Sequence, residues 1–532
     1  MKAQNSYDKL RGGYYTPQTI ADYIVEWAVR SPKDKILEPS CGDGSFLNAL
    51  ITKTICADAI GIELDPVEAK KAAEYGYPVK NGDFFSYYES EIENKQKYDV
   101  ILGNPPFIRY QNFDEQYREV AFRLMKAHGF HPNRLTNIWL PFLLLSCEAL
   151  SDIGRIGMVI PAELFQVDYA AEARNYLSSH FESLTLVTFR KLVFEGIQQE
   201  VIILLGEKQS GNRGIRVVEL DGLDDLITEG QKCLVAAETK QLDHSTDKWV
   251  KYYLSNRELE ILTRLNEDPR ISSASDLYEV NVGLVSGEND FFMLSRETVE
   301  KWGLEEVVTP IIGRSEQVKG IVLSLEEHLA LQKEGKRVFL FTPGDVDLEE
   351  VSDKAKEYIA WGESQQYNSN YKCRIRKHWY HVPMTWTADA FLIRQANLYP
   401  KMILNNAGAL VTDTLHKVRF LPGINGNTVA AAFLNTYTLA LSETLGRSYG
   451  GGVLTFEPGE MRRMRIPMIC ADELDVTKID QWQREGNFKQ ILTYTDKRLL
   501  HGGLGLSESD ISLLHSIWEK MRCRRLSRKQ SM

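Results

Sequence analysis

Apolar and polar residues alternate with two different rhythms along the chain. Up to about residue 206, short apolar runs recur about every 20–25 residues, with amphipathic helical patterns between them. This succession is typical of βαβ units, so it predicts a mostly parallel sheet covered by helices. The first predicted strand begins at Lys35, and the others cover 57–63, 77–80, 100–102, 155–161, 183–189 and 200–206. Predicted helices cover 16–30, 66–75, 138–150 and 170–180. The last two strands are close in sequence, which predicts an antiparallel hairpin at a sheet edge.

The alternation of predicted strands and helices ends at a polar, turn-rich segment, 207–250, where we expect a domain boundary. Beyond it, apolar segments are short and bounded by turns, which predicts a mixed α+β domain. Examples are 339–341, 402–404 and 418–420. The last part has a helical pattern over 507–522 and then basic residues. The expected parts are an α/β domain at 1–240, a mixed domain at 241–500 and a helical, basic tail at 501–532.

Composition narrows the class of protein. The 532 residues are 43% hydrophobic and 26% charged, which is ordinary for a soluble protein and long enough for two or three domains. The seven cysteines are scattered without CxxC pairs, so we expect no disulfides, no zinc site and no other bound metal. Unpaired cysteines also indicate a reducing compartment, so we expect a cytoplasmic location. No apolar run reaches membrane-spanning length, so we expect no membrane partner. The net charge of −10 does not exclude nucleic acid, because phosphate contacts are local.

Two segments near the N-terminus point to a nucleoside cofactor. Glu38-Pro-Ser-Cys-Gly-Asp-Gly44 follows a predicted strand and opens a helix, and glycines there let the backbone approach a ligand closely. The alternative is a glycine-rich turn that binds nothing. Glu63 lies at the end of the next strand, where a carboxylate can accept both hydrogen bonds of a ribose diol. Asp65 can instead cap the following helix. The glycine turn and Glu63 together favour a nucleoside cofactor.

Two more segments follow the next strands. Asp83 can accept a hydrogen bond from an adenine amino group and Phe84 can supply an apolar face, although such a pair is usually a turn and a core residue. Asn104-Pro-Pro-Phe107 contains two prolines that fix the backbone and remove two donors. The Asn104 side chain and the Pro105 carbonyl then remain as acceptors beside the Phe107 ring. This arrangement suits a planar base with an exocyclic amino group.

In this order, the four segments resemble the class I S-adenosylmethionine-dependent methyltransferases, and among them the TaqI-like (γ-class) N6-adenine DNA methyltransferases of type II restriction–modification systems, with Eco57I-type relatives. The resemblance covers about residues 12–206 and includes Tyr14-Tyr-Thr-Pro17. It implies a Rossmann-like, mostly parallel sheet. The implied cofactor-binding residues are Tyr15, Thr16, Pro17, Glu38, Ser40, Cys41, Gly42, Gly44, Glu63, Asp83, Phe84 and Asn104. The implied catalytic residues are Asn104, Pro105, Pro106 and Phe107.

The resemblance also implies that the target adenine leaves the duplex and stacks on aromatic side chains. Phe107 is the first of these, and Phe194 and Tyr110 are the further candidates, with Phe189 competing for the place of Phe194. Many relatives carry Tyr where this chain has Phe107. Stacking survives that change, but a hydroxyl contact does not.

The C-terminal part is expected to recognise the DNA target. The segment 371–381 interleaves basic and aromatic residues, which suits phosphates and bases, although a solvated strand face is the alternative. Its candidate DNA-binding residues are Arg374, Arg376, Lys377, His378, Trp379 and Tyr380. Arg394, Lys401, His416, Lys417 and Arg419 extend the basic character, and segments 281–289, 405–408 and 447–452 resemble those of Eco57I-type enzymes.

The sequence therefore predicts a monomeric, site-specific DNA adenine-N6 methyltransferase that uses S-adenosylmethionine, acts on double-stranded DNA and protects it from a cognate restriction endonuclease. Two alternatives remain open. One is a methyltransferase acting on another planar amino group, such as a protein glutamine or guanine N2 of RNA. The other is a catalytically degenerate DNA-recognition protein.

Overall fold

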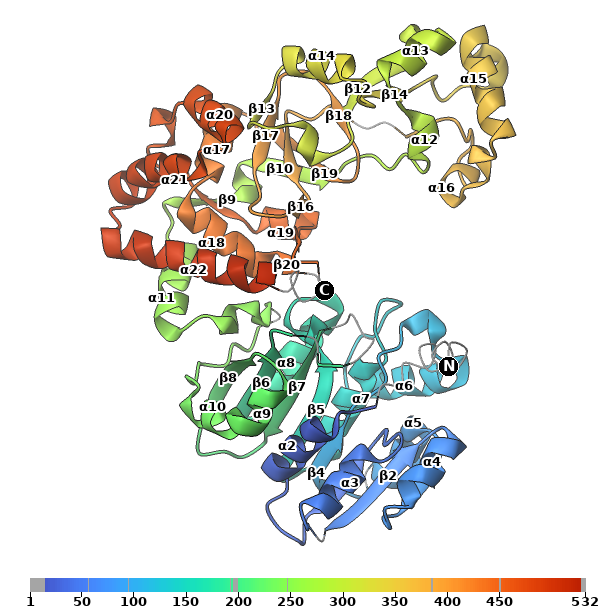
Figure 1. Ribbon diagram of the computed structural model, residues 1–532, viewed down its shortest axis with the longest axis vertical. Helices are drawn as coiled ribbons and strands as arrows, with labels where there is room; N and C mark the ends of the chain where they lie inside the picture. Colours follow the sequence, from blue (N-terminus) through green and yellow to red (C-terminus); the bar gives the residue numbers. More distant parts are fainter. Residues whose placement is uncertain are drawn as a thin grey trace. The chain divides into compact units, whose positions relative to one another are not determined.

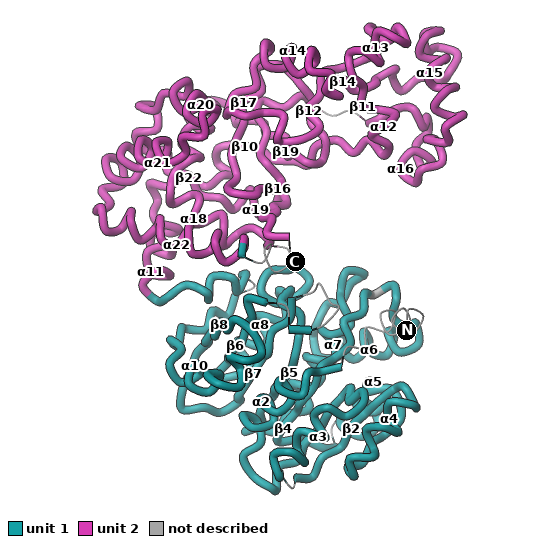
Figure 2. Tube along the Cα trace, viewed as in Figure 1, with its two compact units in different colours: residues 1–256, 527–532 teal, residues 257–526 magenta. Residues whose placement is uncertain are grey.

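The computed structural model describes residues 15–55, 57–93, 95–191, 193–194, 200–245, 247–383, 386–448 and 451–527. The chain forms two compact units, residues 1–256 with 527–532 and residues 257–526 (Figure 2). The boundary falls after Asn256, later than the 240/241 division expected from the sequence. The reason is that Trp249 and Tyr252 are buried in the apolar core of the first unit.

An eight-stranded sheet forms the centre of the first unit, in the order β3-β2-β1-β4-β5-β7-β6-β8 (Figure 1). Strands β1 and β2 are parallel, as are β1 and β4, and β4 and β5. The mostly parallel α/β sheet predicted from the sequence is thus confirmed. Its strands are β1 Lys35–Glu38, β2 Asp58–Glu63, β3 Val79–Asn81, β4 Tyr98–Gly103, β5 Leu150–Pro161, β6 Ser183–Phe189, β7 Val201–Glu207 and β8 Gly214–Leu220.

The predicted edge hairpin needs correction. Strands β6 and β7 do pair antiparallel, but β7 is inserted between β5 and β6. The edge is formed by β8, which pairs parallel with β6 and lies in the segment taken from the sequence to be a polar break. Ile215 and Val218 of β8 are buried, whereas Arg216 and Glu219 are half-buried. This mixed pattern is typical of an edge strand and hid it from the sequence.

Helices cover both faces of the sheet, so the central strands are buried on either side. Ile36 and Val100 face the core beneath α2 and α3, whereas Leu37 and Ile101 face the core that contains α7. The helices are α2 Gln18–Ala28, α3 Ser45–Thr52, α4 Pro66–Ala73, α5 Phe84–Tyr87, α6 Glu115–Ala127, α7 Trp139–Ala149, α8 Ala171–His180, α9 Leu223–Thr228 and α10 Gly230–Ala236. Helix α6 was not predicted from the sequence.

The second unit contains several small sheets, and its mixed α+β character is as predicted. The largest has the strand order β10-β19-β15-β17-β13 and a second has the order β11-β14-β12-β18. The strands are β9 Ile271–Ser273, β10 Tyr278–Val282, β11 Met293–Leu294, β12 Val308–Ile312, β13 Val322–Leu323, β14 Phe339–Phe341, β15 Ala390–Ile393, β16 Gln395–Ala396, β17 Met402–Asn405, β18 Leu410–Val411, β19 Leu415–Phe420, β20 Arg447–Ser448, β21 Leu454–Thr455 and β22 Arg465–Pro467.

Helices flank these sheets, and the last of them replaces the separate tail expected at 501–532. Helix α22 buries Trp518 and Met521, and its Arg525 forms a buried ion pair of 2.8 Å with Glu443 of α18. The helices are α11 Asn256–Glu267, α12 Asn289–Phe292, α13 Arg296–Trp302, α14 Leu325–Lys333, α15 Asp353–Ser364, α16 Tyr371–Arg374, α17 Gly426–Phe433, α18 Thr436–Leu445, α19 Pro458–Arg462, α20 Val476–Glu485, α21 Phe488–Asp496 and α22 Glu508–Ser527.

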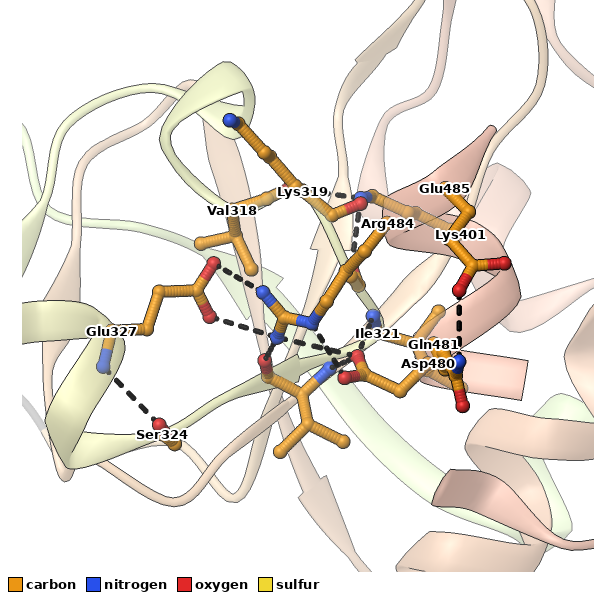
Figure 3. Close-up of polar contacts among 12 residues, drawn as sticks. Val318, Lys319, Ile321, Ser324, Glu327, Lys401, Asp480, Gln481, Arg484 and Glu485 are labelled. Atoms are coloured by element: carbon orange, nitrogen blue, oxygen red, sulfur yellow. Dashed lines mark hydrogen bonds and ion pairs between the residues drawn. The ribbon is translucent and has the colours of Figure 1, made fainter. Parts of the chain in front are cut away.

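A buried lysine fixes the loop before β13 (Figure 3). The Lys401 ammonium donates to the carbonyls of Val318 (2.9 Å), Lys319 (2.9 Å) and Gly320 (2.7 Å). On the other side of the loop, Asp480 accepts from two backbone amides, and Arg484 donates to both Asp480 and Glu327. The Lys401 side chain, which the sequence placed among the basic residues of the recognition domain, therefore has a structural role.

Replacing Lys401 with Met should destabilise the protein. The substitution leaves carbonyl groups buried without a donor, so we expect the free energy of unfolding to fall by about 2–4 kcal/mol. Urea denaturation measures this value. Lys336→Met, at an exposed lysine of the same unit, is the control and should change it by less than about 0.5 kcal/mol. Equal stability of the two variants would contradict the structural role of Lys401.

Candidate active site

A cleft of about 600 Å³ opens at the carboxyl ends of β1, β2, β3 and β4. Ligands of open α/β sheets bind at this edge, because the loops that follow the strands converge there. The four segments singled out in the sequence meet in this one cleft. Its lining includes the predicted site residues Tyr15, Thr16, Glu38, Ser40, Cys41, Gly42, Glu63, Asp83, Phe84, Asn104 and Pro106.

The glycine turn supports one wall of the cleft. Gly42 and Gly44 both have positive φ, +54° and +91°, a conformation that favours glycine. A Cβ atom at Gly44 would lie 2.9 Å from the Cα of Ala72, so the turn also needs a bare backbone where α3 begins beside α4. Gly44 itself and Pro17 do not line the cleft, and Pro17 instead precedes the first turn of α2.

Glu63 lies at the end of β2 with its carboxylate held by the backbone. Its Oε2 accepts from the Gly42 amide and its Oε1 accepts from the Asp65 amide, both at 2.8 Å. Burial raises the pKa of this carboxyl, against these hydrogen bonds. Each carboxylate oxygen can accept more than one bond, so a fixed acceptor remains available to a ligand. Asp65 caps α4 by accepting from the Val67 amide, so the cap and the Glu63 acceptor coexist.

Glu38 brings a buried carboxyl group to the start of the turn. Its side chain is only 2% exposed, and its Oε2 has no hydrogen-bond partner among the described residues. Burial, with Asp43 and Glu63 nearby, raises the pKa of Glu38 well above its usual range. A cationic hydrogen-bond donor in the cleft would satisfy this oxygen. Burial also raises the pKa of the Cys41 thiol, which disfavours the thiolate that a nucleophilic cysteine needs.

Aromatic rings form the apolar wall of the cleft. Phe84 is buried and stacks on Phe142 of α7, with ring centroids 5.2 Å apart and planes at 17°. Asp83 caps α5 by accepting from the Ser86 amide at 2.8 Å. Sequence reasoning missed Phe142, Phe113 and Tyr117, which also line the cleft. Phe142 lies within a continuous apolar run, so no local pattern distinguishes it from its neighbours.

The loop after β4 meets the glycine turn. Asn104 is half-buried and Pro105 is buried, and the Ser40 hydroxyl donates to the Asn104 carbonyl at 3.4 Å. Phe107 is half-buried and packs against the apolar cores on both faces of the sheet. Asn104 and Pro106 line the cleft, whereas Pro105 and Phe107 are not among its lining residues.

The further aromatic candidates are placed differently. Phe194 and Phe189 are 6% and 3% exposed, lie in the apolar core on one face of the sheet, and do not line the cleft. Tyr14 and the side chain of Tyr110 lie outside the described residues.

The basic and aromatic segment of the second unit folds as α16 followed by turns, and not as a strand. Its aromatic residues serve the fold: the Trp379 indole donates to Glu363 at 2.9 Å, and the Tyr380 hydroxyl donates to the Val346 carbonyl at 2.7 Å. His378 lies between Asp345 and Asp347, 2.9 Å from each. Arg374 and Lys377 are exposed, whereas Arg376 is half-buried.

The described residues contain no group of three or more His, Cys, Asp and Glu side chains placed to hold a metal ion. None of the helices they form is both long and apolar enough to cross a membrane.

Sheet order and cleft together define the class of fold: a Rossmann-like α/β domain with an open cleft at the carboxyl edge of its sheet. Two family models match the chain, the Eco57I restriction-modification methylase over residues 47–194 and the C-terminal domain of type II methyltransferase M.Eco57I over residues 246–500. The chain belongs to the Eco57I family of restriction–modification methylases, which confirms the resemblance and the class I methyltransferase fold predicted from the sequence.

Individual relatives agree with this assignment. Type II methyltransferase M.AccI of Acinetobacter calcoaceticus is 24% identical over 85% of this chain and 84% of its own length. Type II methyltransferase M.XamI of Xanthomonas campestris pv. amaranthicola is 22% identical over 86% of this chain and 85% of its own length. A solved DrdV–DNA complex is similar in fold, with a TM-score of 0.51 and 14% identity over 90% of this chain. The chain spans 57% of the length of that structure.

Proposed function

We propose that the chain is a site-specific DNA adenine-N6 methyltransferase of a type II restriction–modification system. The observation that carries the proposal is the position of Asn104, whose loop opens into the same cleft as Glu38, Glu63 and Asp83. A site for a planar amino group and a site for a nucleoside cofactor are thereby joined. The similarity to named type II methyltransferases over most of the chain supports double-stranded DNA as the substrate.

The cleft residues fit S-adenosylmethionine. The buried Glu38 oxygen that lacks a donor suits the ammonium group of the methionine part, and the Glu63 carboxylate suits the ribose diol. Asp83 and Phe84 suit the adenine, with Phe142 extending the apolar wall. When bound, the cofactor supplies an electrophilic methyl group, whose bond to sulfur breaks as the bond to the substrate nitrogen forms.

The loop residues stabilise the transition state. The Asn104 side-chain oxygen and the Pro105 carbonyl accept the two hydrogens of the adenine N6 amino group. These bonds draw the nitrogen lone pair out of conjugation with the ring and stabilise the positive charge that develops on the nitrogen. Phe107 stacks on the flipped base and holds N6 in position for in-line attack. Because the methyl group passes directly from sulfur to N6, no covalent enzyme intermediate forms. N6 then gives up one proton to solvent.

The product identifies the substrate. Purified full-length protein is incubated with methyl-labelled S-adenosylmethionine and one of three substrates: duplex DNA, ribosomal RNA or a release-factor protein. We expect label in DNA only, as N6-methyladenine after digestion to nucleosides. Label as methylated glutamine or guanine N2 would favour the alternative methyltransferase, and N4-methylcytosine would place a different base at Asn104. Absence of label, together with absence of cofactor binding, would support the degenerate recognition protein.

A further inference from the structure

A basic groove of about 590 Å³ lies within the second unit. One wall is residues 282–285, which begin at the last residue of β10, and another is the segment 372–381 that begins in α16. Lys417 of β19 also lines the groove. Both segments stood out in the sequence and neither belongs to the cleft described above. A Cβ at Gly287 would lie 2.9 Å from the Cβ of Lys372, so the chain just after the first segment packs closely against α16.

Positive charge gathers in this groove although the whole chain carries −10. The basic residues of its lining are Lys372, Arg376, Lys377, His378, His381 and Lys417. Asp345 is the acidic residue of the lining and lies 2.9 Å from His378, so it is already paired. The groove is therefore suited to a polyanion.

The cations differ in how firmly they are held. Lys372 and Lys377 are exposed at the rim. Arg376 is fixed, because one of its nitrogens donates to the Val285 carbonyl at 2.9 Å and its guanidinium lies 5.5 Å from the centre of the Phe292 ring. Another of its nitrogens, Nη1, is buried and finds no acceptor among the described residues.

Lys417 is held in place by neighbouring strands and by an aromatic ring. It pairs with Asn281 on β10 and with Phe391 on β15, so its backbone lies within the five-stranded sheet. Its side chain is 7% exposed, and its ammonium lies 4.6 Å from the centre of the Trp386 ring. The Arg419 guanidinium, from the same face of β19, lies 4.3 Å from the same ring. Trp386 thus orients two neighbouring cations.

We propose that this groove binds duplex DNA during target recognition, with Lys372 and Lys377 contacting phosphates and Lys417 contacting a base edge. The proposal rests on the function proposed above. Flexible, exposed lysines suit phosphates, which carry no sequence information, whereas a cation held in place by a sheet and an aromatic ring suits the fixed acceptors of a base. Guanine presents two such acceptors, O6 and N7, in the major groove. Lys417 then determines specificity at one base pair.

The rim lysines are tested by the salt dependence of binding. Full-length Lys372→Ala and Lys377→Ala variants are titrated with duplex DNA at several salt concentrations. Each should weaken binding to all sequences alike and reduce the slope of log affinity against log salt by about 1. Lys336→Ala removes an exposed lysine outside the groove and should leave the slope unchanged. Wild-type slopes in both rim variants would overturn the phosphate contacts. Binding to duplex RNA equal to that of duplex DNA would overturn the assignment of the groove to duplex DNA.

Lys417 is tested by sequence selectivity. In Lys417→Gln, we expect discrimination at one base pair of the target to fall by about 5- to 150-fold while the other positions stay selective. The measurement is competition binding between duplexes that each differ from the target at one position. Unchanged discrimination at every position would overturn the base contact. Because these experiments measure binding, a chain that binds selectively without methylating adenine would refute the proposed function and leave the groove supported.

Discussion

Replacing Asn104 with Ala should lower the rate of methyl transfer by about 10³-fold or more, while S-adenosylmethionine still binds. The Ala side chain removes one of the two acceptors for the N6 hydrogens, and an interaction made mainly in the transition state affects kcat more than ligand affinity. The measurement combines single-turnover methylation of duplex DNA with calorimetric titration of the cofactor. Asn104→Asp keeps an acceptor oxygen and should retain more activity than Asn104→Ala.

Two control variants separate this role from damage to the cleft. Asn112 also lines the cleft but is exposed and follows the loop, so Asn112→Ala should reduce the rate by less than about 10-fold. Glu63→Ala should show the opposite defect, since it removes the fixed acceptor for the ribose and weakens cofactor binding. Near-normal turnover by Asn104→Ala would refute the mechanism, and loss of cofactor binding in that variant would assign Asn104 to the cofactor alone.

Ending the chain at Asn256 should abolish sequence-selective DNA binding and leave a folded domain that binds S-adenosylmethionine. The first compact unit consists of residues 1–256 with the short segment 527–532, and residues 1–256 contain the whole cleft. The basic groove and the sheets that form it lie in residues 257–526 and are removed. Competition binding between a target duplex and a scrambled duplex measures selectivity, and calorimetry measures cofactor affinity.

A shorter truncation is the matched control. A chain ending at Lys240 also lacks Trp249 and Tyr252, which are buried in the core of the first unit, so it should be less stable by about 3–5 kcal/mol or more. Thermal unfolding compares the two fragments. Selective binding by the 1–256 fragment would refute the division of labour between the units, and equal stability of both fragments would contradict the boundary at Asn256.

The first unit was the more predictable part of the fold, and the physical reason is local. Its strands are buried on both faces, so β1, β2, β4 and β7 appear as apolar runs separated by helical patterns. Each motif follows its strand directly, and parallel strands bring their carboxyl ends to one edge. The sequence could therefore predict that Glu38, Glu63, Asp83 and Asn104 converge at this edge.

The predictions that the structure corrects depend on contacts between residues that are distant in sequence. Strand β8 is an edge strand whose half-buried charged residues hide its pattern. Trp249 and Tyr252 are buried in the core of the first unit, although the segment around them is polar in sequence. The boundary between the two units was therefore expected too early in the chain. In the second unit, no local pattern shows that Trp379 and Tyr380 support the fold while Lys372 and Lys377 remain exposed.

We propose that the Asn104 loop positions adenine N6 for methylation within a specific DNA sequence. The most direct test is to express the full-length chain in a bacterial host that lacks DNA methylation, and to sequence the modified bases of the genome, with Asn104→Ala expressed in parallel. The wild-type chain should leave N6-methyladenine at one recurring sequence, and the variant should leave none. Absence of N6-methyladenine from the wild-type genome, or the same methylated sequence in both genomes, would contradict the account.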